Sequence, residues 1–450
     1  MSKKNGAGFD AFISKHLLPI AEKLSQFKPL KAIRDGIAMS MPLIIVGSIF
    51  LIAGSFPITA WTNWIAATSL HGIAIADLFN KIVNASFGLL GVISCYGIAS
   101  SYAAYHETDG QSAGIIAIGS YFAITPSIFT SGKVISEGMP YDYLGSKGLF
   151  IAIIIGLITG GIFQWFINHD IRIKMPETVP PAVSKSFSAL IPGALIISLF
   201  GLIYAIFGWL GLGNVHDLLL HVLSKPLGFL GGTLGGTLIA VFLNSAFWFI
   251  GIHGSSIVNS IMSPIWLMNT DVNRSLFQAG KLTLAHGGKI IAAPFIDNFV
   301  YMGGGGATLG LVLGIALLVS MKKASKQLQV LAPITVTPGI FNINEPTMFG
   351  MPIVLNTSLI IPFLIAPMFN ACTTYFAMAT GIVPLCIGAV VPWTMPPIIS
   401  GFLATNSFMG SALQIVNLIC DILIYLPFLL AQNKQQIIQE AAVDTNEDIA

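Results

Sequence analysis

Apolar residues along this chain gather into about ten long segments, separated by short connections that carry most of the polar residues. A helix of roughly 17–25 apolar residues can cross the ~30 Å hydrocarbon layer of a bilayer. The pattern therefore predicts an all-α integral membrane protein with about ten transmembrane helices, the third of them short. We place the predicted spans near residues 36–56, 83–105, 113–127, 149–167, 187–211, 231–252, 305–320, 331–350, 353–378 and 407–432.

Two further segments show the spacing of amphipathic helices. In residues 9–28 apolar side chains recur at helical intervals, and Pro29 follows directly, which is where we expect the helix to end. Residues 215–228 (VHDLLLHVLSKPLG) repeat this pattern between the fifth and sixth spans. One-sided helices of this kind lie in the interfacial layer of a membrane. We predict an N-terminal surface helix and an interfacial connector in the middle of the chain.

Two segments of the second half are interrupted by polar residues, glycine or proline. Residues 253–300 mix pieces such as HGSSIVNS and AHGGKIIAAP with apolar runs too short to span, and residues 380–403 contain GIVPLCIGAVVPWTMPPIISG. Irregular backbone at membrane depth is stable only inside protein or beside a wet cavity. We predict two re-entrant hairpins around a binding site; surface loops are the alternative.

Composition supports the membrane assignment. Hydrophobic residues make up 54% of the chain, charged residues only 9%, and the mean hydropathy is +0.82. A soluble domain needs about a quarter of its residues charged to face water. The net charge of +2, from scattered basic residues, gives no indication of a nucleic-acid partner.

The four cysteines indicate neither a metal site nor a disulfide framework. Cys95, Cys372, Cys386 and Cys420 each lie within an apolar run, with no C-x-x-C pair and no histidine at ligand spacing. We expect buried thiols packed between helices, no metal and no cofactor.

Lysine and arginine counts predict the orientation of the chain. With the N-terminus in the cytoplasm, fourteen basic residues fall on the inside and four on the outside, while Arg274, Lys281 and Lys289 lie in the unassigned stretch 253–300. Inside loops of membrane proteins carry the excess of positive charge. We therefore expect both termini to be cytoplasmic.

Glu345 is the first candidate for chemistry. Of the 94 residues between Lys326 and Asp421 it is the only charged one, and a carboxylate at membrane depth costs at least a few kcal/mol. Asn342 and Asn344 lie next to it, and together these groups offer the acceptors and donors that bind hydroxyls. The alternative is a structural hydrogen bond between helices.

His253 and Trp393 are the next candidates. His253, in the sequence GIHG, follows a span that is rich in aromatic residues, and it could accept a proton, donate to a hydroxyl or orient Glu345. Trp393 lies among prolines in VPWTMPP, where a rigid indole could stack on a sugar ring. Their structural alternatives are a helix cap or interfacial residue for the histidine and an interfacial belt residue for the tryptophan.

The other features of the second half suggest less. The run Gly303–Gly306 does not match a phosphate-binding P-loop, so we expect that this polypeptide does not hydrolyse ATP. A tight turn or close helix approach explains the run. Arg274, Lys289 and Asp297 are expected to pair with one another or to attract an anionic group.

Several motifs together resemble the membrane component, enzyme IIC, of bacterial sugar phosphotransferase systems, in the lactose, cellobiose and diacetylchitobiose branch. NINEP is the most specific of them, and the similarity covers essentially the whole chain. The motifs are LLPIAEKLSQ (17–26), RDGIAMSMPLIIVGSIFLI (34–52), GIHG (251–254), GGGGATLG (303–310) and PGIFNINEPTMFGMP (338–352).

The resemblance implies a homodimer in the bacterial cell membrane. Its first five spans would make the dimer contacts, and the later five, with the two hairpins, would hold one sugar. The expected organisation is an N-terminal amphipathic helix (1–29), a dimerisation region (30–212), an amphipathic connector (213–230), a sugar-binding transport domain (231–432) and a polar cytoplasmic tail (433–450).

The same resemblance implies the reaction. The sugar is carried inward and its 6-hydroxyl receives phosphate from a phosphocysteine of a IIB protein, with IIA, HPr and enzyme I upstream. Family members use the histidine of GIHG and the glutamate of NEP near that hydroxyl, here His253 and Glu345, and a tryptophan that stacks on the sugar, here Trp393. Asn342 and Asn344 complete the predicted substrate-binding set.

The phosphodonor is expected to be a separate polypeptide. Lactose-type members commonly carry a fused IIB domain, whereas this sequence ends at Ala450 after a short polar tail and has its cysteines in apolar runs. That difference favours a β-linked disaccharide of the cellobiose type as the substrate. Two alternatives remain: a proton-coupled sugar symporter that uses Glu345 as the proton site, and a membrane scaffold that transports nothing.

Overall fold

The computed structural model describes residues 23, 26–131, 134–176, 178–351, 353–354, 356 and 358–447. The predicted helix 9–28 lies almost entirely outside these residues. The rest is an assembly of helices with two small β-hairpins, in which β1 (Ser69–Leu70) pairs with β2 (Ile73–Ala74) and β3 (Ile128–Ser131) with β4 (Val134–Glu137). The all-α prediction is confirmed in part, because the described residues are mainly helical and also form two short β-hairpins.

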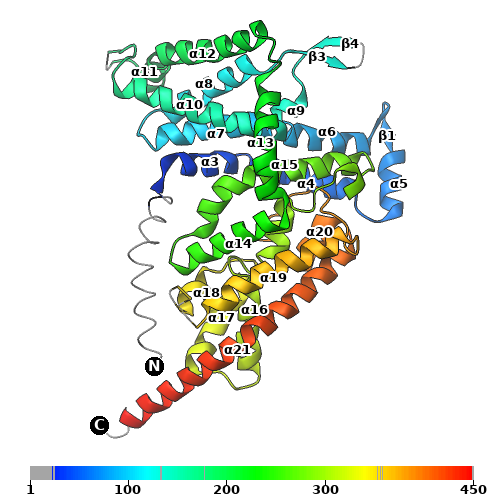
Figure 1. Cartoon of the computed structure of the whole chain (residues 1–450), viewed down its shortest axis with the longest axis vertical. Coiled ribbons are helices and arrows are strands. Elements are labelled where there is room, and N and C mark those ends of the chain that lie inside the picture. Colours follow the sequence, from blue (N-terminus) through cyan, green and yellow to red (C-terminus); the bar gives the residue numbers. More distant parts are fainter. Residues whose placement is uncertain are drawn as a thin grey trace.

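The helices form two groups, which meet along α3 and α15 (Figure 1). The first group occupies the upper part of that view in blue to green. Its helices are α3 (Lys28–Ala38), α4 (Met41–Gly54), α5 (Thr59–Ala67), α6 (Ile75–Phe87), α7 (Leu90–Ala104), α8 (Gly110–Ile124), α9 (Tyr141–Leu144), the 3-10 turn η2 (Ser146–Gly148), α10 (Leu149–Asn168), α11 (Pro181–Ser188) and α12 (Leu190–Trp209).

The second group follows the connector helix α13 (Val215–Gly232), which runs vertically in Figure 1 across the other helices. Its elements are α14 (Leu234–Phe249), α15 (Gly254–Gln278), the 3-10 turn η3 (Leu284–His286), the π-helical turn η4 (Phe295–Val300), α16 (Leu309–Ser320), α17 (Lys326–Ile340), α18 (Glu345–Gly350), α19 (Ile360–Ala379), α20 (Ile399–Thr405) and α21 (Phe408–Glu447).

Apolar helices long enough to cross a membrane recur through both groups. Within the described residues there are six, and three shorter apolar helices accompany them, namely α8, α14 and α16. The chain is thus a multi-pass membrane protein. The long candidates are Lys28–Gly54, Ile75–Ala104, Ser146–Asn168, Pro181–Trp209, Ile360–Ala379 and Phe408–Ala441.

Helix α15 was not predicted from the sequence, although its 25 residues fill half of the interrupted stretch 253–300. The sequence of α15 contains too many polar residues to be predicted as a membrane span. Its asparagines form hydrogen bonds with the backbone of neighbouring irregular segments. The Asn269 amide donates to the Ile291 carbonyl at 2.8 Å. The Asn273 amide donates to the carbonyls of Lys289, at 2.7 Å, and Cys386, at 3.0 Å. These bonds satisfy backbone groups that have no partner in a helix.

The second interrupted stretch, 380–403, is irregular as far as residue 398, where α20 follows, and residues 385–391 within it are buried. Its backbone finds partners elsewhere in the protein: the Ile387 amide donates to Ala404 at 2.8 Å, and the Val390 amide donates to Ser48 Oγ at 2.8 Å. Residues 389–391 are at most 2% exposed. The surface-loop alternative is therefore wrong for this part of the segment, as expected for irregular backbone inside a membrane protein.

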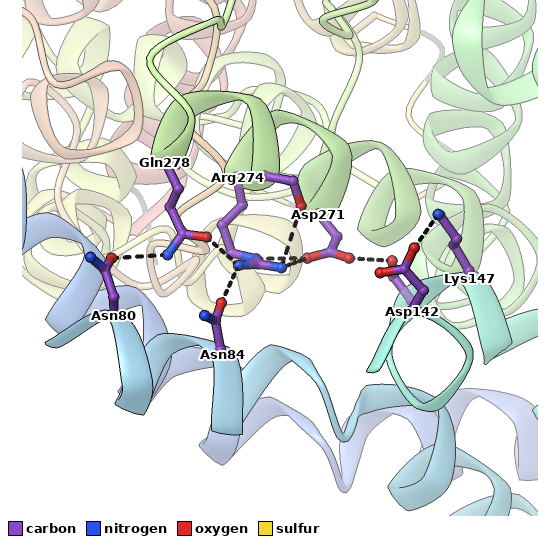
Figure 2. A network of polar contacts seen from close by, with 9 residues as sticks. Asn80, Asn84, Asp142, Lys147, Asp271, Arg274 and Gln278 are labelled. Atoms are coloured by element: carbon purple, nitrogen blue, oxygen red, sulfur yellow. Dashed lines mark hydrogen bonds and ion pairs between the residues drawn. The ribbon is translucent and has the colours of Figure 1, made fainter. Parts of the chain in front are cut away.

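The two groups are joined by a polar network around Arg274 of α15 (Figure 2). Its guanidinium bonds to Asp271 at 2.7 Å, to Gln278 at 2.6 Å and to Asn84 of α6 at 3.0 Å. Asp271 also accepts a hydrogen bond from Ser146 of η2 at 2.5 Å. Arg274 therefore pairs with Asp271, and the expected pairing with Lys289 and Asp297 is wrong.

The last helix continues beyond the predicted apolar span 407–432 and includes most of the polar C-terminal tail. Helix α21 continues from Phe408 to Glu447, because residues 433–447 contain neither glycine nor proline. Glu440 accepts hydrogen bonds from the backbone amides of Lys326, at 3.0 Å, and Gln327, at 3.1 Å. These amides lie at the start of α17, where a helix supplies no backbone acceptor of its own, so the tail caps a helix of the second group.

Candidate functional site

A cavity of about 410 Å³ opens between the two helical groups. Residues from α3, α14, α15, η4 and the segments around 303–306, 342–345 and 390–393 line it. Small-molecule sites usually measure about 300–1,000 Å³. The five residues predicted to form the site all line this cavity: His253, Asn342, Asn344, Glu345 and Trp393.

Glu345 begins the short helix α18, and Pro346 is the next residue. Among the described residues, none forms a hydrogen bond or ion pair with its carboxylate, although its charge acts on the ring of His253. The structural alternative, a hydrogen bond between helices, therefore has no support. A carboxylate held at the edge of a cavity is available to a ligand hydroxyl.

His253 caps the N-terminus of α15. Its Nδ1 accepts from the backbone amide of Ser256 at 3.2 Å, and Ser256 Oγ lies 2.9 Å from the same atom. The ring also packs against Trp248, with 4.4 Å between ring centroids. Because a backbone amide donates to Nδ1, the proton of the neutral ring is on Nε2. His253 is thus a cap, and in its neutral form it offers a donor to a ligand.

The two asparagines hold the site together. The Asn342 amide nitrogen donates to the carbonyls of Trp393, at 2.5 Å, and Met395, at 3.1 Å, while its oxygen accepts from the Gly303 amide at 2.6 Å. The Asn344 amide nitrogen donates to the Gly305 carbonyl at 3.1 Å. Asn342 therefore has both its amide hydrogens engaged, and its geometry favours positioning Trp393 over contacting a substrate.

The glycine run Gly303–Gly306 lies in a tight turn, one of the two explanations suggested from the sequence, and Gly304 and Gly305 form a wall of the cavity. Gly304 adopts φ +89°, and a Cβ there would lie 2.8 Å from Asn344 Cγ. The loop is tied down by Tyr425, whose hydroxyl donates to the Gly306 carbonyl at 2.6 Å. Glycine is needed because backbone and cavity residues approach within van der Waals contact.

Aromatic side chains line the cavity at several places. Trp393 is 53% exposed, and it lies at the cavity and not among the outer helices. Trp266 of α15 is 2% exposed, and its indole nitrogen has no hydrogen-bond partner among the described residues. An indole combines an apolar face with one donor, which suits a ligand that has both apolar faces and hydroxyls.

Two charged lining residues were missed as members of the site. Asp297 lies in η4 within FIDNFV, and its place in the cavity could have been suspected because it is a second carboxylate in an apolar stretch. Arg34 lies in α3, in the first helical group. In the sequence analysis it contributed only to the count of basic residues on the cytoplasmic side. No local signal connects it to Glu345, some 300 residues later.

The family model described as "Phosphotransferase system, EIIC" matches residues 34–367. The chain is 40% identical to the cellobiose-specific EIIC component of Geobacillus stearothermophilus, covering 97% of each protein. It is 39% identical to the lichenan permease IIC component of Bacillus subtilis, covering 95% of this chain and 94% of the relative. The crystal structure of ChbC, the IIC component for N,N'-diacetylchitobiose, superposes with a TM-score of 0.89 at 39% identity, covering 96% of this chain and 99% of ChbC.

Proposed function

Because this chain belongs to the phosphotransferase system EIIC family, we propose that it imports a β-linked disaccharide of the cellobiose type and presents the sugar's 6-hydroxyl to the phosphocysteine of a IIB partner. The observation that carries the proposal is the meeting of Glu345, His253 and Trp393 at one cavity, from three separate segments of the chain. Its volume of about 410 Å³ suits a disaccharide.

In the proposed reaction, Glu345 is the general base. The 6-hydroxyl oxygen attacks the phosphorus of the phosphocysteine, and its proton passes to the Glu345 carboxylate. A phosphorus–oxygen bond forms, the phosphorus–sulfur bond breaks, and the electron pair leaves on the cysteine sulfur. The charged product cannot recross the bilayer, so phosphorylation traps the sugar inside.

His253 and Trp393 hold the sugar for this attack. The Nε2 proton of neutral His253 can donate to a sugar oxygen, which fixes the hydroxyl near Glu345. Trp393 offers its indole face to the apolar face of a sugar ring, and Asn342 keeps its backbone in place. Asn344 secures the glycine wall through Gly305.

The organisation predicted from the sequence belongs to the same proposal. Both termini face the cytoplasm, where a IIB protein would deliver its phosphoryl group. The first helical group forms a homodimer, the second carries the sugar, and the segments near 253–300 and 380–403 fold back within the membrane. Helix α13 serves as the interfacial connector between them.

Transport in membrane vesicles tests the function. Vesicles loaded with phosphoenolpyruvate, the general phosphotransferase proteins and a IIB protein are expected to accumulate the 6-phosphate of cellobiose and no free sugar. The rival symporter would accumulate free sugar on a pH gradient without these components. That outcome would overturn the phosphotransferase proposal, and a protein without saturable sugar binding would favour the scaffold alternative.

The replacement Trp393→Ala tests the stacking role. We expect the Kd for cellobiose to rise about 10–100-fold, roughly 1.4–2.8 kcal/mol, because tryptophan is among the largest contributors to binding at buried contacts. Trp393→Phe is expected to lose less. Trp209→Ala is the control, since Trp209 is 77% exposed at the end of α12 and away from the cavity. Isothermal titration on purified protein measures all three, and equal affinities for Trp393→Ala and the control would contradict the role.

A further inference from the structure

The cavity has an uneven distribution of charge. Two carboxyl groups line it, those of Glu345 and Asp297, and Arg34 is the one lysine or arginine among the described lining residues. The transferred phosphoryl group brings about two further negative charges. Placing that group beside Glu345 would gather like charges in a site that is partly shielded from water, where their repulsion is large. A cation in this cavity would offset that repulsion, and Arg34 is the candidate.

Hydrogen bonds with neighbouring side chains hold the Arg34 guanidinium in position. Its Nε donates to Asp35 Oδ1 at 2.6 Å, and the hydroxyl of Tyr105, at the end of α7, donates to the other oxygen of Asp35. The Lys31 ammonium lies 5.9 Å from the centre of the Tyr105 ring. Lys31, Arg34 and Asp35 together keep one net positive charge. The Arg34 guanidinium also forms a hydrogen bond with the Tyr105 side chain. Because arginine carries five N–H donors, others remain for a ligand in the cavity that Arg34 lines.

Arg34 lies toward the membrane face from which the IIB partner is proposed to deliver the phosphoryl group. It lies six residues after the start of α3, about 9 Å along the helix axis, near the end of the span that is predicted to face the cytoplasm. Arg34, His253 and Glu345 line the same cavity. Arg34 thus belongs to the same electrostatic environment as the predicted acid–base pair, although it comes from the other helical group.

We propose that Arg34 binds the phosphoryl group as it passes from the IIB cysteine to the sugar and remains in contact with the phosphorylated product. The proposal rests on the proposed function and adds to it a phosphoryl-binding residue. Arginine suits this task because its planar guanidinium offers paired donors that match phosphate oxygens. Positioned cations supply most of the protein's contribution to phosphoryl transfer. Asp35 and Tyr105 are positioning residues, which act only through Arg34.

Reconstituted full-length protein with phosphorylated IIB and cellobiose provides the test. We expect Arg34→Gln to lower the transfer rate at saturating sugar by about 100-fold or more and to leave the Kd for cellobiose within about threefold, since uncharged sugar needs no cation. Arg34→Lys is expected to recover part of the rate, because it keeps the charge and loses the paired donors. Asp35→Asn should lose less than Arg34→Gln.

Product affinity gives a second readout that a purely structural role would not change. Cellobiose 6-phosphate is expected to compete with cellobiose about tenfold less well in Arg34→Gln than in the wild type, roughly the weight of one charge-assisted contact. Arg172→Gln is the matched control. Arg172 also pairs with a nearby aspartate, at 2.9 Å, and its side chain is 39% exposed against 36% for Arg34, but it lies away from the cavity.

The outcomes separate this proposal from the proposed function. A wild-type protein that passes no phosphoryl group to the sugar overturns both. A wild type that does so, with Arg34→Gln equally fast or with sugar and product affinity falling together, overturns only the role of Arg34. A slow Arg34→Gln with normal cellobiose binding, weakened product binding and partial recovery in Arg34→Lys supports it.

Discussion

Replacing Glu345 with glutamine is expected to slow phosphoryl transfer to the sugar by about 10²–10⁴-fold, the usual contribution of a positioned general base. Glutamine has the same shape and can still bond to a hydroxyl, but it cannot accept the proton that the 6-hydroxyl loses. Sugar affinity should therefore change by less than about tenfold. The measurement is the single-turnover rate of sugar phosphate formation, with cellobiose binding recorded on the same preparation.

Glu107→Gln is the control for this experiment. Glu107 is exposed in the turn between α7 and α8 and does not line the cavity, so its neutralisation should leave the rate unchanged. A Glu345→Gln protein that transfers phosphate within about tenfold of the wild-type rate would remove the carboxylate from the reaction. A loss of sugar binding as large as the loss of rate would instead assign Glu345 to substrate binding alone.

Replacing Arg274 with alanine is expected to cost about 3–5 kcal/mol of stability, because it leaves Asp271 as an uncompensated, mostly buried charge. The side chains of this pair are 10% and 18% exposed. The substitution also removes bonds to Asn84 and Gln278 and the contact of the guanidinium with Phe87, whose ring centre lies 4.9 Å away (Figure 2). Thermal unfolding in detergent micelles measures the effect.

The neighbouring pair Lys147–Asp142 supplies the control. It appears in the same view (Figure 2), but its side chains are 52% and 65% exposed, so Lys147→Ala should cost less than about 1 kcal/mol. The double replacement Arg274→Met with Asp271→Leu is expected to recover much of the loss, since it leaves no unpaired charge. An Arg274→Ala protein that melts at the wild-type temperature would show that the network does not hold the two helical groups together.

Much of the site could be predicted because charge is rare in this chain. An isolated carboxylate in an apolar stretch identified Glu345, and glycine or proline on both sides identified His253 and Trp393. The structure brings these residues to one cavity; their roles stay predictions for the experiments above. Asn342 shows the limit of such reasoning, because its amide is engaged by the backbone of two distant loops, and sequence neighbourhood to Glu345 could not reveal that.

By itself, the sequence determined the class of the protein and the family to which it belongs. Low charge and repeated apolar segments require a lipid environment, because exposing that surface to water is too costly, and the motifs around 251–254, 303–310 and 338–352 are local. Helix α15 escaped this reading. Its asparagines and arginine are typical of a surface exposed to water. In the structure, the asparagines instead donate to buried carbonyls and the arginine donates to a neighbouring helix.

Only the tertiary structure decided which charges face one another. Arg274 pairs within its own helix and joins the two groups, Asp297 turns to the cavity, and Arg34 reaches the same cavity from the opposite end of the chain. Periodicity reports the apolar face of each helix separately, because it depends on local spacing. The partner of a polar side chain depends on which helices pack together, and that is settled by contacts between segments hundreds of residues apart.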